Sequence, residues 1–199
     1  MADMEKTGKN LEGRGFRVHR FASGAEAAEF LVQTLHGTSI GIGGSVTIDT
    51  LGVYDRLCGS NEVFWHWKNH ASETRERAGK AETYLCSANG VSENGEIVNI
   101  DGFGNRVAGT IYGPERVFLV VGRNKIATDL TGAIDRARNI AAPLNARRLN
   151  RHTPCAVGEP RCHDCRSPEK VCGVMTVFFM PPTSIKEFHV ILVDEDLGY

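Results

Sequence analysis

One continuous apolar run constrains the fold of this chain more than any other feature. Residues 117–121 read VFLVV, between Arg116 and Gly122. A strand that is apolar at every position must be covered on both faces, which is typical of a parallel sheet packed between helices. The run is far shorter than the roughly 20 residues that span a bilayer. We therefore expect the central strand of a buried parallel sheet and no membrane span.

Strand and helix patterns alternate along the rest of the chain. Ser23 and Glu26 have the capping-box spacing at the start of a helical pattern. Strand patterns occupy residues 16–21, 39–42, 63–65, 83–88, 174–179 and 188–193, and helical patterns occupy residues 23–35, 45–57, 73–80 and 129–141. This alternation predicts an α/β fold with a mainly parallel, Rossmann-like sheet. The length of 199 residues predicts a single domain over 1–199.

Two local signals refine this prediction. Asn94-Gly95 lies between residues 91–93 and 96–100 and predicts a two-residue β-hairpin, inserted into the sheet or added at its edge. Pro143 follows the helical pattern of residues 129–141 and should either end or kink that helix.

Composition excludes several classes of protein. The chain has 23 basic and 24 acidic residues, a net charge of −1, and 41% hydrophobic residues. These values exclude a disordered, collagen-like or coiled-coil chain. The near-zero net charge also argues against a nucleic-acid partner. Residues 1–6 are not followed by the apolar segment of a signal peptide, so we expect a cytoplasmic protein.

A glycine turn follows the strand pattern of residues 39–42. It lacks the GxGxxG spacing and the Walker lysine, which excludes dinucleotide-binding and P-loop sites. Backbone N–H groups at such a turn can approach an anion. The alternative is a tight strand-to-helix connection with the serine as an ordinary N-cap. The candidate ligand-binding residues here are Gly43, Gly44, Ser45 and Thr47.

Further polar residues follow other predicted strands. Ligands of open α/β sheets bind outside the carboxyl ends of the strands, so these residues should meet in one crevice with the glycine turn. We expect Asp101 to act as a general base and Arg106 to hold an anion. The additional candidate ligand-binding residues are Asn89, Asn105, Asn124 and Lys125. The alternative is that Asp101 and Asn105 are turn formers and that Arg106 forms a surface ion pair.

Four cysteines cluster near the C-terminal end: Cys155, Cys162, Cys165 and Cys172. Their segment, residues 151–173, is rich in Pro, Gly and charge, and a bound metal would supply the stability that it lacks. Four thiolates suit either zinc or an iron–sulfur cluster, with His152 and His163 as spare ligands. The alternative, two disulfides, is disfavoured in the cytoplasm. Cys58 and Cys86 lie elsewhere and are expected to be buried.

Several of these blocks occur in the order found in a known family. The chain resembles the LUD (lactate utilisation) domain family, in particular its short, stand-alone members with a cysteine-rich segment. The resemblance runs from about residue 5 to the end of the chain. It is carried by residues 42–47, 87–90, 101–107, 122–125, 139–149, the cysteine segment and residues 193–198.

The resemblance implies a fold like that of ribose-phosphate isomerase, glucosamine-phosphate deaminase and CoA-transferases. In that group, the loop corresponding to Gly43, Gly44 and Ser45 holds a phosphate or CoA-type ligand. Family members are linked to oxidation of L-lactate to pyruvate, alongside a related subunit that carries iron–sulfur clusters. This chain lacks the ferredoxin run C-x2-C-x2-C-x3-C, which favours a structural metal knot over an electron relay.

Three functions follow as hypotheses. The first is a component of lactate utilisation that binds a small anion, either a hydroxy acid or a phosphate-containing molecule, with partner redox subunits or as a homo-oligomer. The second is a sugar-phosphate or acyl-CoA enzyme. The third is a non-catalytic scaffold subunit. Because the sequence has neither a flavin motif nor a full ferredoxin motif, we do not expect a complete dehydrogenase, and catalysis by the isolated chain stays open.

Overall fold

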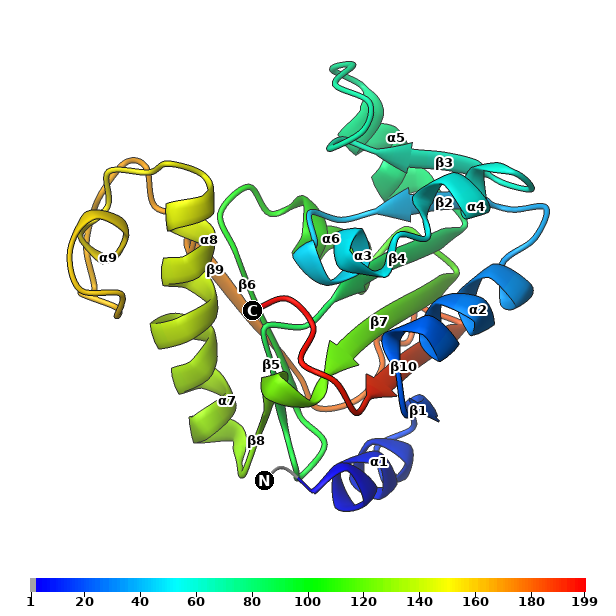
Figure 1. Ribbon diagram of the computed structural model, residues 1–199, viewed down its shortest axis with the longest axis horizontal. Helices are drawn as coiled ribbons and strands as arrows, with labels where there is room; N and C mark the ends of the chain where they lie inside the picture. The colour runs from blue at the N-terminus through cyan, green and yellow to red at the C-terminus, as the bar shows by residue number, and fades with distance from the viewer. Residues whose placement is uncertain (1–2) are drawn as a thin grey trace.

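The computed structural model describes residues 3–199 and contains a six-stranded sheet in which every pairing is parallel (Figure 1). In sheet order the strands are β1 (Arg17–Phe21), β10 (Glu187–Val193), β7 (Arg116–Gly122), β4 (Thr83–Ser87), β2 (Ser39–Ile42) and β3 (Glu62–Trp65). The predicted α/β class with a mainly parallel sheet is confirmed.

The apolar run forms β7, in the interior of this sheet. Val117, Leu119 and Val121 belong to one buried cluster, and Phe118 and Val120 belong to another. Successive side chains of a strand point to opposite faces, so the two clusters cover both faces of the sheet. The run is continuous because neither face is exposed to water.

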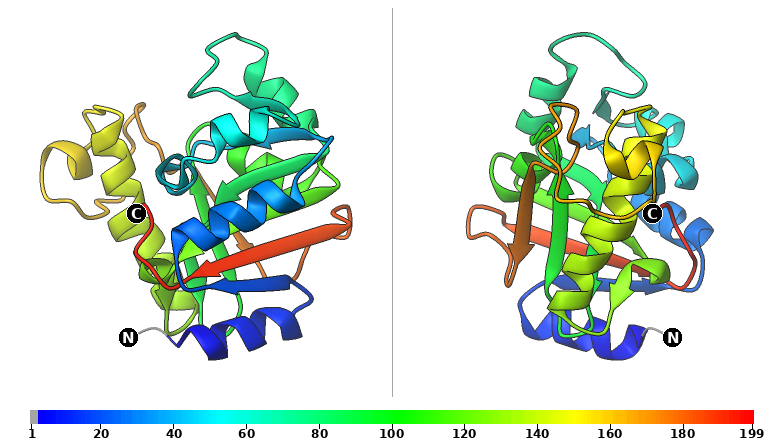
Figure 2. Two further views of the ribbon diagram at one scale, coloured as in Figure 1. Left: turned by 45° about the vertical axis from the view of Figure 1, so that its right-hand side comes forward. Right: turned by 90° about the vertical axis from the view of Figure 1, so that its left-hand side faces the viewer.

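Helices cover each face of the parallel sheet (Figure 2). The cluster on one face includes residues of α2 (Gly24–Thr34), α3 (Val46–Leu51) and α4 (Tyr54–Cys58). The other face is covered by α1 (Met4–Gly13), α5 (Thr74–Lys80) and α6 (Asn105–Ile111). The single helix expected over residues 45–57 is divided into α3 and α4, because Gly52 ends α3 in the left-handed conformation with φ 64°.

A second, four-stranded sheet was not predicted. Its order is β8 (Ile126–Ala127), β5 (Gly90–Ser92), β6 (Ile97–Asp101) and β9 (Val174–Phe178). The predicted antiparallel hairpin β5–β6 is present, but the prediction that it joins the main sheet is wrong. Its strands pair instead with β8 on one side and β9 on the other, which makes a separate sheet. Its loop is longer than expected. Ser92 N–H donates to the Glu96 carbonyl, and Gly95 has φ 91°, as in three-residue hairpin loops.

One long helical rod packs on the second sheet. It consists of α7 (Leu130–Arg136), a π-helical turn (Ala137–Ala141) and α8 (Ala142–Arg148). Pro143 lacks an N–H and its ring crowds the preceding turn, so the wider π turn lets the helix continue past the proline. Ala133, Ala137 and Ala142 face Val98 and Ile100 of β6. The chain then passes through α9 (Pro154–Val157) and the cysteine segment into β9.

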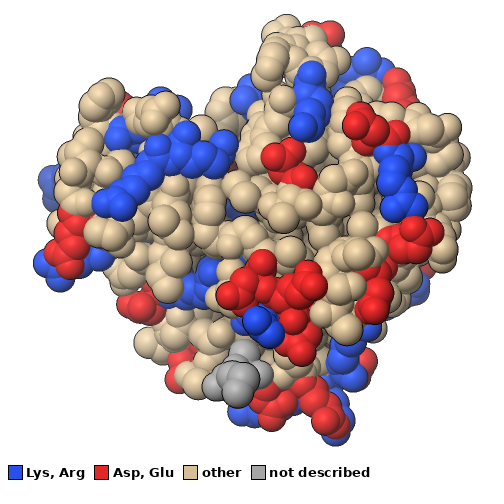
Figure 3. Space-filling model, viewed as in Figure 1, with Lys and Arg blue, Asp and Glu red and all other residues tan. Residues whose placement is uncertain are grey.

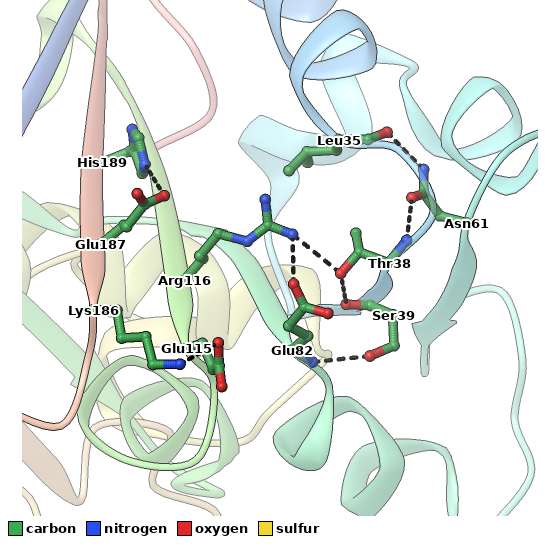
Figure 4. Close-up of polar contacts among 10 residues, drawn as sticks. All are labelled: Leu35, Thr38, Ser39, Asn61, Glu82, Glu115, Arg116, Lys186, Glu187 and His189. Carbon is green, nitrogen blue, oxygen red and sulfur yellow. Dashed lines mark hydrogen bonds and ion pairs between the residues drawn. The ribbon is translucent and has the colours of Figure 1, made fainter.

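Ion pairs and hydrogen bonds occupy the amino ends of the parallel strands (Figure 4). Arg116 Nη2 donates to Glu82 Oε1 at 2.9 Å and to Thr38 Oγ1 at 3.1 Å. Lys186 Nζ lies 2.8 Å from Glu115 Oε2. Charges of opposite sign are therefore matched at this edge. None of the helices within residues 3–199 has the length and apolar character that crossing a membrane requires.

Candidate functional site

A cavity of about 700 Å³ opens at the carboxyl ends of the parallel strands. Its walls come from the loops that follow β2, β3, β4, β6 and β7, from α8, and from residues 168–171 and 199. Figure 3 shows a hollow between the two upper lobes of the molecule, with Lys and Arg side chains on both sides. The volume lies in the range of small-molecule sites.

The structure brings together most of the residues predicted from the sequence. The cavity is lined by Gly44, Ser45, Thr47, Asn89, Asp101, Asn105, Arg106 and Lys125. Gly43 is not one of the lining residues, although it lies against Arg106. Asn124 is elsewhere, because its amide holds the C-terminal tail by donating to the Gly198 carbonyl at 3.0 Å and accepting from Leu197 N–H at 3.1 Å.

The glycine turn serves to bring neighbouring segments into contact. A Cβ at Gly43 would lie 3.1 Å from Arg106 Cγ and 3.2 Å from Cys86 Cβ, so a larger residue would push Arg106 away. Ser45 Oγ accepts from Ile48 N–H at 3.2 Å, which is the ordinary capping bond of the short helix α3. This bond matches the structural alternative for Ser45.

Asp101 holds the first turn of α6. Its carboxylate accepts from the backbone N–H groups of Phe103 at 3.2 Å, Arg106 at 3.0 Å and Val107 at 3.3 Å. The bonds from Arg106 and Val107 satisfy N–H groups that the start of a helix leaves without partners, and the bond from Phe103 holds the turn before it. Sequence reasoning interpreted residues 101–106 as a turn and missed the helix that begins there.

The Arg106 guanidinium is anchored by oxygens of the protein. It donates to Asn89 Oδ1 at 2.7 Å, to the Ser87 carbonyl at 3.3 Å and to Asn99 Oδ1 at 3.4 Å, and it also donates to the Ile100 carbonyl. All these acceptors are uncharged, so Arg106 places a fixed positive charge at the cavity wall.

Lys125 is the most deeply buried basic side chain of the cavity, with 2% of its surface exposed. Its Nζ donates to Thr47 Oγ1 at 2.7 Å and to Ser87 Oγ at 2.8 Å. Burial lowers the pKa of this amine well below its ordinary value, and the nearby charges of Arg136 and Arg106 lower it further. The amine therefore loses its proton more readily than an exposed lysine does.

Basic side chains outnumber carboxylates around the cavity. Among the residues that the structure describes, six basic side chains line it, against only Asp101 and Glu169: Arg75, Arg106, Lys125, Arg148, Arg151 and Lys170. Within the described residues, none of the six forms an ion pair with a carboxylate. Since the whole chain has a net charge of −1, this excess is local. It suits a ligand that carries negative charge.

Aromatic and polar side chains hold the outer guanidiniums in place. The Arg148 guanidinium lies 4.5 Å from the Trp67 ring centroid, and its Nε donates to Tyr199 Oη at 2.9 Å. The Arg75 guanidinium lies 4.9 Å from the Phe103 ring centroid. Such contacts fix the position of a cation without neutralising it.

His66 is a further residue of the cavity that sequence reasoning missed. Burial, assisted by the charges of Arg75 and Arg148, lowers its pKa to about 4, so the ring is neutral at pH 7. Its Nδ1 is buried without a hydrogen-bond partner among residues 3–199. His66 and Trp67 directly follow β3. The expectation that ligands bind at the carboxyl ends of the strands, applied to β3, would have identified both residues. The same expectation could not identify the cavity residues that do not follow a strand of the parallel sheet. These belong to α8 and to the chain segments at 151 and 199: Asn145, Arg148, Arg151 and Tyr199.

The four cysteines are partly buried free thiols. Across residues 3–199, no three His, Cys, Asp or Glu side chains are arranged to hold a metal ion. The four cysteines nevertheless interact electrostatically. Burial raises the pKa of Cys172, and the charges of Cys162, Cys165 and Cys155 each raise it further.

The same segment reaches the cavity, which residues 168–171 line. Of the two remaining cysteines, Cys86 is buried as expected, whereas the expectation for Cys58 is wrong, because this thiol is exposed at the end of α4.

Comparison with solved structures supports the fold. The chain is similar to a DUF162 family protein from Deinococcus radiodurans, with a TM-score of 0.56 and 13% sequence identity over 96% of this chain and 95% of that chain. At this identity the likeness concerns the fold alone. A comparison with curated proteins gave no match.

Comparison with family profiles covers nearly the whole chain. The profile described as LUD domain matches residues 4–193, which include both sheets and every residue singled out above except the tail residues 197–199. The chain therefore belongs to the LUD domain family.

Proposed function

We propose that this protein is a component of lactate utilisation whose cavity binds a small carboxylate, either a 2-hydroxy acid or its 2-oxo product. Membership of the LUD domain family supports the pathway. The observation that carries the proposed ligand class is the set of basic side chains around the cavity that lack carboxylate partners in the described structure.

The basic side chains divide into an outer and an inner group. Arg75, Arg148 and Arg151 are exposed, so they attract an anion from solution. Arg106 and Lys125 lie deeper, among the uncharged hydrogen-bonding groups of Ser87 and Asn89. A carboxylate that reaches the inner group would supply the negative charge that this region lacks.

Asp101 is the proposed general base, and Arg106 is the proposed partner of the ligand carboxylate. Both residues also support the fold, Asp101 by capping α6 and Arg106 by bonding to Asn89 and neighbouring carbonyls. A test of their catalytic roles must therefore separate loss of turnover from loss of stability.

The size of the cavity favours one alternative. A volume of about 700 Å³ is far more than a three-carbon acid fills. Together with basic side chains on several walls, it suits a larger ligand such as a sugar phosphate or an acyl-CoA. The protein would then be an enzyme of the kind known for this fold group.

We also propose that Cys155, Cys162, Cys165 and Cys172 bind one zinc ion or one iron–sulfur cluster. Their spacing and the electrostatic effect of three of them on Cys172 support this. Zinc would hold residues 151–173 together as a structural knot, whereas a cluster would add electron transfer. Partner redox subunits or a homo-oligomer would complete the activity.

A calorimetric titration tests the ligand class. L-lactate, pyruvate, inorganic phosphate and glucose 6-phosphate are titrated separately into the protein at low ionic strength. Binding of lactate or pyruvate in preference to the phosphates supports the main proposal, and the reverse preference supports the alternative. If none of the four binds, the protein is better explained as a scaffold subunit.

A further inference from the structure

The inner end of the cavity places an amine beside a region that lacks a counterion. Lys125 Nζ has two hydroxyl partners, and in the described structure no carboxylate is paired with it. Arg106 and Arg136 lie near enough for their charges to act on it. A ligand complementary to this end would carry both a negative charge and a group that reacts with an amine.

The hydrogen bonds around Lys125 determine which part of the amine is available. Thr47 Oγ1 donates its own hydrogen to the Leu197 carbonyl at 3.2 Å, and Ser87 Oγ donates to the Ala88 carbonyl at 3.3 Å. Both hydroxyls are thus left to accept from Nζ, and they take up the two hydrogens of a neutral amine. The nitrogen lone pair is then free of partners within residues 3–199, in a side chain that lines the cavity.

We propose that Lys125 Nζ condenses with the carbonyl carbon of a 2-oxo acid bound in the cavity and forms an imine. The nitrogen lone pair forms the new bond to carbon. The carbon–oxygen double bond breaks, and the two amine hydrogens leave with the carbonyl oxygen as water. No oxidant or reductant is consumed.

The surroundings of Lys125 favour this reaction. An amine attacks a carbonyl only in its unprotonated form, and burial lowers the pKa of Lys125. The carboxylate of a 2-oxo acid would lie in the positive field of Arg106 while its carbonyl meets the amine. The inference rests on the proposed function, because a 2-oxo acid is the oxidised form of the proposed hydroxy acid.

Reductive trapping tests the imine directly. The protein is incubated with pyruvate and sodium borohydride, which converts an imine into a stable secondary amine, and the product is analysed by intact mass and peptide mapping. We expect one reduced pyruvyl group per chain, on the peptide that contains Lys125. L-lactate, which has no carbonyl group, should give no label.

Two variants make the test specific. Lys125→Met should abolish labelling, and it should fold, because Thr47 and Ser87 keep their own bonds to backbone carbonyls. Lys186→Met is the matched control, since Lys186 is an exposed lysine paired with Glu115 at the opposite edge of the sheet. This variant should label like the wild type.

The outcomes separate this inference from the proposed function. If pyruvate binds by calorimetry but no label forms, or if the label lies on Lys170 or persists in Lys125→Met, the imine is disproved while the anion site stands. Glyoxylate and 2-oxoglutarate are carried through the same procedure. If none of the three 2-oxo acids binds, the imine is disproved, and the proposed function then stands or fails on whether L-lactate binds by calorimetry.

Discussion

At the scale of one residue, burial changes the proton affinity of Lys125. A lysine normally avoids the interior unless it is paired, because removing its charge from water is costly. Here Lys125 is 2% exposed, and within residues 3–199 its amine is bonded only to hydroxyls.

The same residue predicts how stability depends on pH. Its pKa in the folded protein lies below the unfolded value of 10.5, so between these two values the unfolded chain binds more protons. This contribution therefore stabilises the protein as pH rises towards 10.5, and it is lost as pH falls. We expect the free energy of unfolding of the wild type to rise relative to that of Lys125→Met between pH 7 and about pH 10. Urea denaturation of both proteins measures this difference, and parallel pH profiles would contradict it.

Asp101 gives a second prediction at this scale. Asp101→Ala should destabilise the protein by about 1 kcal/mol, because the N–H groups of Arg106 and Val107 at the start of α6, and that of Phe103 before it, lose their acceptor. Asp101→Asn keeps an acceptor oxygen and should cost much less. If Asp101 is also the general base, Asp101→Asn should bind the ligand normally but lose turnover. Equal stability of the wild type and Asp101→Ala would rule out the capping role.

At the scale of elements, the sequence predicts helices and strands that depend on a local residue pattern. It does not predict which strands pair when they lie far apart in the chain. The N-cap predicted at Ser23 is present, with Ser23 Oγ accepting from Glu26 N–H at 3.2 Å, while Glu26 Oε2 accepts from the N–H of Ala22, one residue before the N-cap, at 2.9 Å. The apolar pattern likewise placed β7 correctly. By contrast, β9 pairs with β6 across more than 70 residues, and no local signal specifies that choice. Arg148 and Tyr199 escaped prediction as cavity residues for the same reason.

The cysteine segment provides a prediction about an element. In protein purified anaerobically, the double variant Cys162→Ser/Cys165→Ser should lose bound metal and become sensitive to protease within residues 151–173. Its far-ultraviolet circular dichroism should remain near that of the wild type, because both sheets have their own buried clusters. Cys58→Ser is the control, as this exposed thiol lies outside the segment. A wild-type protein without metal, or with two disulfides under reducing conditions, would contradict the metal proposal.

At the scale of the whole molecule, the two edges of the parallel sheet differ in how charge is arranged. At the amino edge, Arg116 and Lys186 are paired with Glu82 and Glu115. At the carboxyl edge, the basic side chains of the cavity have no such partners in the described structure. Like charges held close together repel, so an anion bound there should stabilise the folded protein.

Thermal unfolding checks this expectation. A ligand that binds only the folded state stabilises it by about 2.7 kcal/mol at 100 times its dissociation constant. Pyruvate or L-lactate should therefore raise Tm, and the increase should diminish with added sodium chloride, which screens the exposed guanidiniums. An increase that does not respond to salt would point to a binding site away from these charges.

The central claim is that the cavity at the carboxyl edge is an anion site, and calorimetry on a matched pair of arginine variants tests it most directly. Arg148 is exposed at the cavity, whereas Arg77 is exposed away from it and paired with Glu62. We predict that Arg148→Ala binds the preferred anion about tenfold more weakly than the wild type, a difference of ~1.4 kcal/mol, and that Arg77→Ala binds it with unchanged affinity. Equal affinities in all three proteins, or an equal loss in both variants, would contradict the account.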